Sequence, residues 1–245
     1  MDLQLNNKKA FVFGSSTGIG YAIAESLIAE KTIVTLNSRN PDRLQSSVNK
    51  LKAHDGIAAD LAKPNEAKKA TAEAIKKMNG LDILVMNTGG PAKGSFSDVS
   101  SEQWHMDFQN LWMSFVEATK EALPIMKKQK YGRIILVTSL AAKEPLANLT
   151  TSNGLRAGLA GLCKSLANEV AADGITVNLL LPGYTDTDRL KELNLSQEKI
   201  KQMVPAGRLG IPKELADMAC FLASPLAGYI TGQSIAIDGG VLRGH

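Results

Sequence analysis

Short apolar runs alternate with longer amphipathic segments along nearly all of this sequence. The runs have the length of strands, and the segments between them repeat their apolar residues with a helical period. Such alternation favours a parallel sheet covered by helices on both faces. With 245 residues, 44% of them hydrophobic, the chain can fill one sizeable core. We therefore expect one doubly wound α/β domain over residues 1–245.

The positions of the individual elements follow from the same pattern. Strands are expected over residues 9–13, 32–36, 56–59, 82–86, 133–137, 175–180 and 234–237. Helices are expected over residues 18–30, 41–51, 64–78, 101–128, 152–172 and 212–223, with a helical excursion over residues 188–204. The helix over 152–172 carries Gly154, Gly158 and Gly161 on one stripe. Since each glycine costs a helix about 1 kcal/mol relative to alanine, we expect these to allow close approach of another backbone.

Charge and composition argue against several classes of partner. The net charge is +4, but the basic residues come as pairs such as Lys68-Lys69 and Lys127-Lys128 near expected helix ends. Without a basic stripe interleaved with aromatics, we interpret these pairs as solvated surface and expect no nucleic-acid partner. No apolar run approaches the roughly 18 residues of a membrane span, and no secretory leader is recognisable. A cytoplasmic protein without a membrane partner is the expectation.

Metal and disulfide chemistry have little to build on. The only cysteines, Cys163 and Cys220, are far apart and lie in apolar helical patterns, which is typical of core thiols. The three histidines are isolated, and no Cys/His cluster occurs. We therefore expect no metal site.

A glycine-rich turn follows the first expected strand and opens the first expected helix. Its glycines are Gly14, Gly18 and Gly20. Such a turn directs backbone N–H groups and the positive end of the helix toward a pyrophosphate. The alternative is an ordinary strand-to-helix loop, because three glycines alone are a weak signal.

The end of the second expected strand bears on the choice between NAD and NADP. A carboxylate there would bind the ribose 2′-hydroxyl and repel a 2′-phosphate, whereas an arginine would pair with that phosphate. The chain has no carboxylate at this point and instead reads Asn37-Ser38-Arg39-Asn40. This favours NADP, with Ser38 and Arg39 on the phosphate. The alternative is that Arg39 is a solvated loop residue.

These motifs recur in a known combination. The glycine turn, Asn87-Thr88-Gly89, Ser139, Pro182-Gly183 and the final Ile237-Asp238-Gly239-Gly240 resemble the short-chain dehydrogenase/reductase family along nearly the whole chain. The resemblance is closest to its 3-oxoacyl-(acyl-carrier-protein) reductase branch. Two departures are Phe13, where the family usually has Thr, and Met86, where it has the first Asn of its Asn-Asn-Ala-Gly signature.

The resemblance implies a Rossmann-type fold, an NADP(H) cofactor and a homotetramer. In that tetramer the helices over 101–128 and 152–172 would pair across one two-fold axis and the last strand across another. The cofactor-binding residues that it implies are Gly14, Ser16, Gly18, Ile19, Gly20, Ser38, Arg39, Asp60, Leu61, Asn87, Gly89, Arg156, Pro182, Gly183 and Thr187. Asn87 could instead be structural, tying adjacent strands together.

The catalytic residues of the family are replaced at most positions. The family uses Ser, Tyr, Lys and Asn to polarise the carbonyl, donate the proton, hold the ribose and fix a relay water. Matched by spacing, this chain keeps Ser139 but has Ser152 at the Tyr position, Arg156 at the Lys position and Leu111 at the Asn position. Asn110 is one residue early, and one residue is about 100° of helix rotation, so we expect it to point elsewhere. A local bulge would change this.

The replacements alter the chemistry that the site can perform. Ser152 is too short to reach where a phenol reaches, and an alkyl alcohol is a poor acid. A guanidinium stays protonated and cannot relay a proton. The space left by the ring could hold a water among Ser139, Ser152 and Arg156, or it could admit another group: Tyr184, Thr151 or Lys143.

Three functions remain open. The first is an NADP-dependent oxidoreductase acting on a carbonyl/alcohol pair, with a small-molecule or acyl-thioester substrate between Ser139, the 90–98 loop and the 188–204 excursion. Ser139, Ser152 and Arg156 would then be catalytic. The second is a non-catalytic nucleotide-binding sensor or partner subunit, and the third is an oligomeric scaffold that needs no cofactor. We favour the first.

Overall fold

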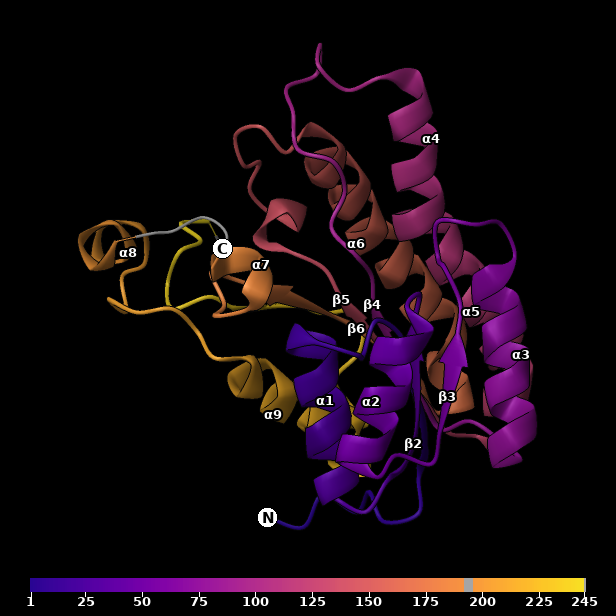
Figure 1. The fold of residues 1–245 in the computed structure, drawn as a ribbon. Coiled ribbons are helices and arrows are strands. Elements are labelled where there is room, and N and C mark those ends of the chain that lie inside the picture. Colours follow the sequence, from indigo (N-terminus) through magenta and orange to yellow (C-terminus); the bar gives the residue numbers. More distant parts are fainter. Residues whose placement is uncertain (192–195, 245) are drawn as a thin grey trace.

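The structure, a computed structural model, is a single parallel sheet between two layers of helices (Figure 1). It describes residues 1–191 and 196–244, without the side chains of Arg189 and Lys191. The sheet order is β3-β2-β1-β4-β5-β6-β7, and every strand pair is parallel. The strands are β1 (Lys9–Val12), β2 (Ile33–Ser38), β3 (Asp55–Ala58), β4 (Ile83–Asn87), β5 (Gly132–Val137), β6 (Ile175–Pro182) and β7 (Ser234–Ile237).

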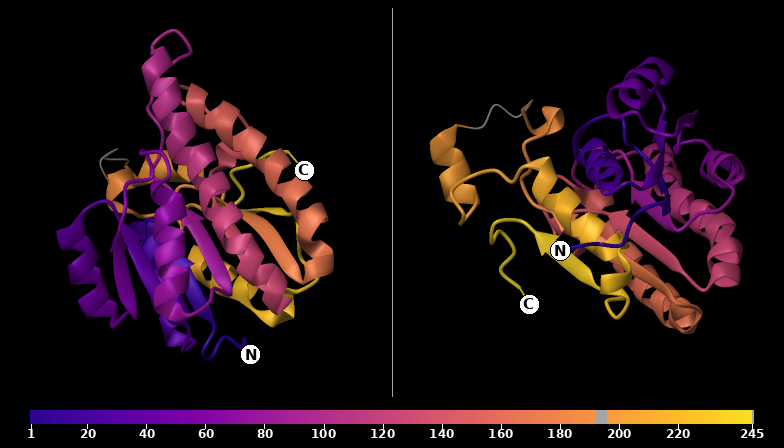
Figure 2. Two further views of the ribbon diagram at one scale, coloured as in Figure 1. Left: turned by 90° about the vertical axis from the view of Figure 1, so that its right-hand side faces the viewer. Right: turned by 90° about the horizontal axis from the view of Figure 1, so that it is seen from below.

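The helices fall on the two faces of the sheet. One face carries α1 (Gly18–Ala29), α2 (Pro41–Leu51) and α9 (Pro212–Ala223), and the other carries α3 (Glu66–Met78), α5 (Ser114–Gln129) and α6 (Thr150–Val170) (Figures 1 and 2). Each layer has its own hydrophobic core against the sheet. The helix α4 (Ser101–Phe108) extends beyond the sheet, and α7 (Asp188–Lys191) and α8 (Gln197–Met203) lie at the periphery. The expected doubly wound α/β domain is confirmed.

Local signals account for one of the elements whose bounds agree with expectation. The helix α2 has the expected bounds because Asn40 caps it, with Oδ1 accepting from the Arg43 N–H at 2.9 Å, and Pro41 fits its first turn. It ends at Lys52, whose φ is 53°. Most other boundaries differ from expectation by one to three residues, as for α6, expected at 152 and found from Thr150.

Two expected helices are divided in the structure. The helix over 101–128 is α4 and α5 joined by one π-helical turn, Gln109–Met113. The excursion over 188–204 contains the short helices α7 and α8. Residues 192–195 of that excursion lie outside the described residues.

The glycines of α6 do not have the expected role within this chain. A Cβ at Gly158 would lie 2.7 Å from the Trp112 indole, so the close neighbour is a side chain and not a backbone. Gly161 has no atom within 4 Å of such a Cβ, and at Gly154 the nearest is Trp104 at 3.9 Å. Among the described residues of this one chain, no other backbone therefore comes close to these glycines.

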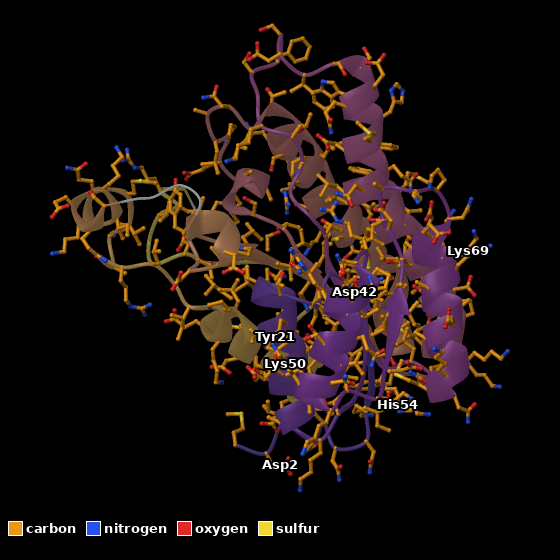
Figure 3. The ribbon with its side chains drawn as sticks, in the orientation of Figure 1. Asp2, Tyr21, Asp42, Lys50, His54 and Lys69 are labelled. Carbon is orange, nitrogen blue, oxygen red and sulfur yellow. The ribbon has the colours of Figure 1, made fainter. Side chains whose placement is uncertain are left out.

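A surface lysine and the two cysteines lie where the sequence predicts them. Lys69 extends outward from α3 and pairs with Glu66 at 3.0 Å (Figure 3). Both cysteines are buried, and burial raises the pKa of Cys163 and of Cys220 to about 12, so they are core thiols. Within the described part of the chain, no helix combines the length and the apolarity that crossing a membrane requires.

Candidate functional site

The candidate site lies at the carboxyl ends of the strands, where the strand order changes direction. From β1 the chain builds outward through β2 and β3, and then restarts on the other side of β1 with β4. In an open parallel sheet, the loops on either side of such a switch point diverge and leave a crevice. The glycine turn leaves β1 at this crevice, and Asn87 ends the neighbouring β4.

Two asparagines hold the glycine turn in shape. Gly14 has a φ of +57°; its N–H donates to Oδ1 of Asn37 at 3.3 Å, and its carbonyl accepts from Nδ2 of Asn87 at 2.9 Å. A Cβ at Gly14 would lie 2.1 Å from the Asn87 carbonyl oxygen, and one at Gly20 would lie 2.3 Å from the Gly14 carbonyl oxygen. Only glycine fits at either position.

The amino terminus of α1 fits a phosphate group. Gly18 begins the helix, and the preceding Thr17 makes no side-chain cap, so the first N–H groups of α1 are not covered by their own N-cap. A Cβ at Gly18 would meet only the Thr187 side chain, at 3.6 Å, so the space above the turn is open. Backbone donors at a helix amino terminus favour an anion. The residues present therefore fit the pyrophosphate of a dinucleotide.

At the end of β2 lies a polar pair with a cation beside it. The Ser16 hydroxyl donates to Oγ of Ser38 at 3.0 Å, and the Asn40 N–H donates to the same oxygen at 3.2 Å. Ser38 is 6% exposed, whereas Arg39 is exposed. The Asn37 side chain points inward and donates to the Ile57 carbonyl at 3.0 Å. Ser16 and Ser38 are thus hydrogen-bonded to each other, and the exposed Arg39 follows Ser38 directly in the chain.

The remaining predicted cofactor residues lie at neighbouring loops. The Asp60 carboxylate accepts from the Ala62 N–H at 3.2 Å, and Leu61 is buried, so both belong to the turn after β3. Pro182 ends β6, and a Cβ at Gly183 would lie 2.5 Å from Cα of Asp238, so this glycine allows the β6 and β7 ends to meet. The half-buried Ile19 and the exposed Gly89 complete the set.

The predicted catalytic residues come from a turn after β5 and from α6. Oγ of Ser139 accepts from the Ala141 N–H at 3.2 Å and caps the short 3₁₀ turn Leu140–Ala142. This turn packs against α6. Ser152 and Arg156 are four residues apart on α6, hence on one face, and are 4% and 6% exposed. The structure thus buries all but a small part of both side chains.

Three polar side chains that sequence reasoning missed shape the site: Asp107 and Asn153 near α6, and Asn37 at the glycine turn. Asp107 accepts from the Ala92 N–H at 3.2 Å, which fixes the 90–98 loop. Asn153 donates to the Leu146 carbonyl at 2.9 Å and accepts from the Leu146 N–H at 3.0 Å. Asn37 was noticed only for lacking a charge. Their partners are distant in sequence or backbone atoms, so no sequence pattern marks them.

The three alternative proton donors differ in their exposure. Thr151 is fully buried, and its hydroxyl donates to the Ala92 carbonyl at 3.4 Å. Lys143 is exposed and Tyr184 is half-buried.

Two pockets of the described residues border α1. One of about 350 Å³ borders Gly18 and Thr187 and also contacts Tyr21, whose pKa is raised by burial and by Glu25 (Figure 3). A larger one of about 410 Å³ lies between α1 and α9 and contacts none of the predicted site residues.

Comparison with known proteins decides the family. A family model described as enoyl-(acyl carrier protein) reductase matches residues 14–242. 3-Oxoacyl-[acyl-carrier-protein] reductase FabG of Vibrio cholerae is 35% identical, with 98% of this chain and 99% of that protein covered. The chain belongs to the short-chain dehydrogenase/reductase family.

Other members of the family resemble this chain equally along its length. The NADPH-dependent reductase BacG of Bacillus subtilis is 32% identical over 98% of this chain and 99% of that protein. The crystal structure of L-sorbose reductase from Gluconobacter frateurii, complexed with NADPH and L-sorbose, superposes with a TM-score of 0.94 at 30% identity and covers both chains fully.

One residue assignment from spacing is wrong. Leu111 is 1% exposed and belongs to the hydrophobic core, while Nδ2 of Asn110 lies 3.5 Å from the Gly89 carbonyl oxygen at the site. The reason is the π-helical turn Gln109–Met113, which adds a residue to one turn and so changes the direction of the side chains that follow. Asn110, and not Leu111, is therefore the residue of this helix that reaches the site.

The position of Leu111 in the core determines the expected effect of Leu111→Asn. An amide in this core position would be buried without the partners that it needs, so we expect a loss of about 2–4 kcal/mol in the free energy of unfolding. Asn110→Leu is the matched control and should cost less than about 1 kcal/mol, because Asn110 is only half-buried. Urea unfolding measures both. Equal losses for the two variants would contradict the placement.

Proposed function

We propose that this protein is an NADPH-dependent reductase of a carbonyl compound. The observation that carries the proposal is the shaped glycine turn with its open helix terminus, at the same sheet edge as Ser139. The relatives include an NADPH-dependent reductase and 3-oxoacyl-[acyl-carrier-protein] reductases, which supports a carbonyl substrate. An acyl thioester or another small carbonyl compound is the substrate class.

The choice of NADPH over NADH rests on the end of β2. The Ser16–Ser38 pair offers hydroxyls, Arg39 offers a charge, and no carboxylate follows Ser38 directly. A 2′-phosphate would gain charge-assisted hydrogen bonds here.

We expect Arg39→Asp to weaken NADPH binding by about 10- to 100-fold, because it removes an attraction and adds a repulsion. NADH binding should change little or improve. Lys50→Asp, at the other end of α2 from Asp42, is the charge-matched control and should leave both affinities unchanged (Figure 3). Fluorescence titration with both cofactors measures this. If both respond alike to Arg39→Asp, Arg39 does not contact the phosphate.

The mechanism assigns roles to three side chains. When bound, NADPH would supply a hydride to the carbonyl carbon. Because the Ser139 oxygen accepts the Ala141 N–H, its own hydrogen is available to bond the substrate oxygen. Arg156 would hold the nicotinamide ribose and stabilise negative charge on the reduced oxygen. Ser152 is too weak an acid to be the source of the proton, so a water among Ser139, Ser152 and Arg156 would relay a proton from the solvent to the reduced oxygen.

The second candidate is a non-catalytic nucleotide-binding protein. Two buried replacements, Ser152 and Arg156, stand where the family has its Tyr and Lys, and they favour this candidate. A screen of NADPH oxidation over short ketones, acetoacetyl thioesters and ketoses, with NADPH binding measured in parallel, separates the two. Turnover of any class supports the reductase, while binding without turnover supports the sensor or partner subunit.

A homotetramer belongs to the same proposal. Met106 and Phe108 of α4 are 50% and 39% exposed, and apolar residues of this size are typical of a covered surface. Burial of α4 to α6 against a second copy would cover them.

A further inference from the structure

The carboxyl-terminal segment is folded back over the site by one aspartate. After β7, Gly239 and Gly240 adopt φ values of 64° and 88°, which reverse the chain direction. The two oxygens of Asp238 accept from the Gly240 N–H at 2.9 Å and from the Leu242 N–H at 2.8 Å. The segment of residues 239–244, called the tail below, is therefore built as a turn and not left as a free end. It lies on the carboxyl side of the sheet, opposite the amino terminus (Figures 1 and 2).

A second carboxylate fastens the far end of the tail. One oxygen of Glu144, Oε1, accepts from the Arg243 N–H at 2.8 Å and from the Gly244 N–H at 2.6 Å. Both are charge-assisted hydrogen bonds to backbone, and they join residues about a hundred positions apart. Between the two anchored ends, Val241 and Leu242 pack against the core that contains Leu140 and Ala142.

Glu144 belongs to the same turn as Ser139. Its N–H donates to the Leu140 carbonyl at 3.0 Å, at the end of the turn that Ser139 caps. Two residues further on, Leu146 is held from both sides by the Asn153 amide, next to Ser152 on α6. Glu144 is thus fixed between Ser139 and Ser152, and through it the tail is fixed to both.

The other side of the tail contacts the segment that follows α8. The Ala206 N–H donates to the Gly239 carbonyl at 3.0 Å, and a Cβ at Gly239 would lie 2.9 Å from the Val204 side chain. The tail therefore spans from the Ser139 turn to residues 204–206. A substrate that approaches Ser139 from between these two segments meets the tail as a wall.

We propose that Glu144 is a positioning residue, which fastens the tail as one wall of the substrate opening and holds the Ser139 turn in place through it. The role of the tail as a wall of the substrate opening rests on the proposed function. The fastening of the tail by Glu144 does not. Glu144 does not touch the reacting atoms.

Hydrogen exchange on the full chain with NADPH tests the fastening without any turnover. In Glu144→Ala, we expect amides of residues 241–244 and of residues 140–146 to exchange about tenfold faster or more, since two charge-assisted bonds are lost. Glu144→Gln retains an oxygen acceptor without the charge and should show a smaller increase. Glu169→Ala, at an exposed position near the end of α6, is the matched control and should match the parent.

Kinetics test the consequence for substrate. With a carbonyl substrate that the parent reduces, Glu144→Ala should raise KM by about tenfold with kcat within about threefold, because ground-state positioning is what is lost. In Glu144→Gln, KM should rise much less than in Glu144→Ala. The Kd for NADPH should stay within about twofold of the parent in both variants.

The outcomes separate this inference from the proposed function. Unchanged exchange over 241–244 overturns the fastening, and faster exchange there with an unchanged 140–146 segment overturns the role at the Ser139 turn. An unchanged KM overturns the role of the tail as a wall of the substrate opening. If exchange rises in both segments while no variant turns over any substrate, the fastening stands and the reductase function fails.

Discussion

Ser152→Tyr combined with Arg156→Lys is expected to raise the turnover of a 3-oxoacyl thioester by about 10²- to 10⁴-fold, the usual contribution of a positioned general acid. This corresponds to roughly 3–5 kcal/mol of activation free energy. The expectation rests on Ser139, which is placed on a capped turn packed against α6, and on Ser152 and Arg156, which share one face of that helix. A lysine beside the new phenol would lower its pKa by favouring the phenolate.

Three further measurements test whether a gain in turnover comes from general acid catalysis. Each single variant should gain much less turnover than the double variant, because the tyrosine needs the lysine to lower its pKa and the lysine alone supplies no general acid. Adding Ser139→Ala should remove most of the gain. NADPH affinity should remain close to that of the parent.

Two outcomes would contradict it. If the double variant abolishes an activity that the parent has, Ser152 and Arg156 are themselves the working arrangement and water delivers the proton. If neither gain nor loss occurs while NADPH still binds, the non-catalytic function is the one that stands.

Gly14→Ala is expected to weaken NADPH binding by at least about 100-fold, and to lower the free energy of unfolding by about 2–4 kcal/mol. The added Cβ would lie 2.1 Å from the Asn87 carbonyl oxygen at a φ of +57°, so the turn must move away from β4. Moving it breaks the bonds of Gly14 to Asn37 and Asn87 together. The helix terminus then no longer faces the crevice.

The control for Gly14→Ala is another loop glycine with room for a methyl group. At Gly210, φ is not positive and the nearest atom to an added Cβ is 3.6 Å away. Gly210→Ala should therefore bind NADPH like the parent and unfold within about 0.5 kcal/mol of it. Isothermal titration and thermal unfolding measure both variants. Normal affinity in Gly14→Ala would contradict the role of the glycine turn.

The sequence predicted the fold because each element is specified locally. Apolar runs such as residues 83–86 of β4 are fully buried, and α2 carries both its cap and its first-turn proline. The π-helical turn Gln109–Met113 could not be predicted in this way, since the apolar periodicity of 101–128 continues through it. Its effect was to exchange Asn110 and Leu111 between site and core.

The site was predicted less completely than the fold. Glycines with positive φ are visible in sequence because no other residue replaces them easily, and this located the turn at Gly14 and Gly18. The tie from Asn37 to Gly14 spans 23 positions and that from Asn87 spans 73, and both use side chains that are common in loops. Such long-range amide bonds become apparent only when the sheet order is known.

The asparagine ties give the two halves of the molecule a degree of independence. The glycine turn is held by asparagines of β2 and β4, and the Ser139 turn packs against α6 and is tied to the chain end through Glu144. No hydrogen bond of the described residues links Ser152 to the glycine turn. The free-energy effects of substitutions near the Ser139 turn should therefore add to those of substitutions at the glycine turn. A lineage could thus exchange its proton-transfer residues, or lose them, while the nucleotide cradle stays intact. The same separation makes this chain a convenient host for installing a different chemistry beside an unaltered cofactor.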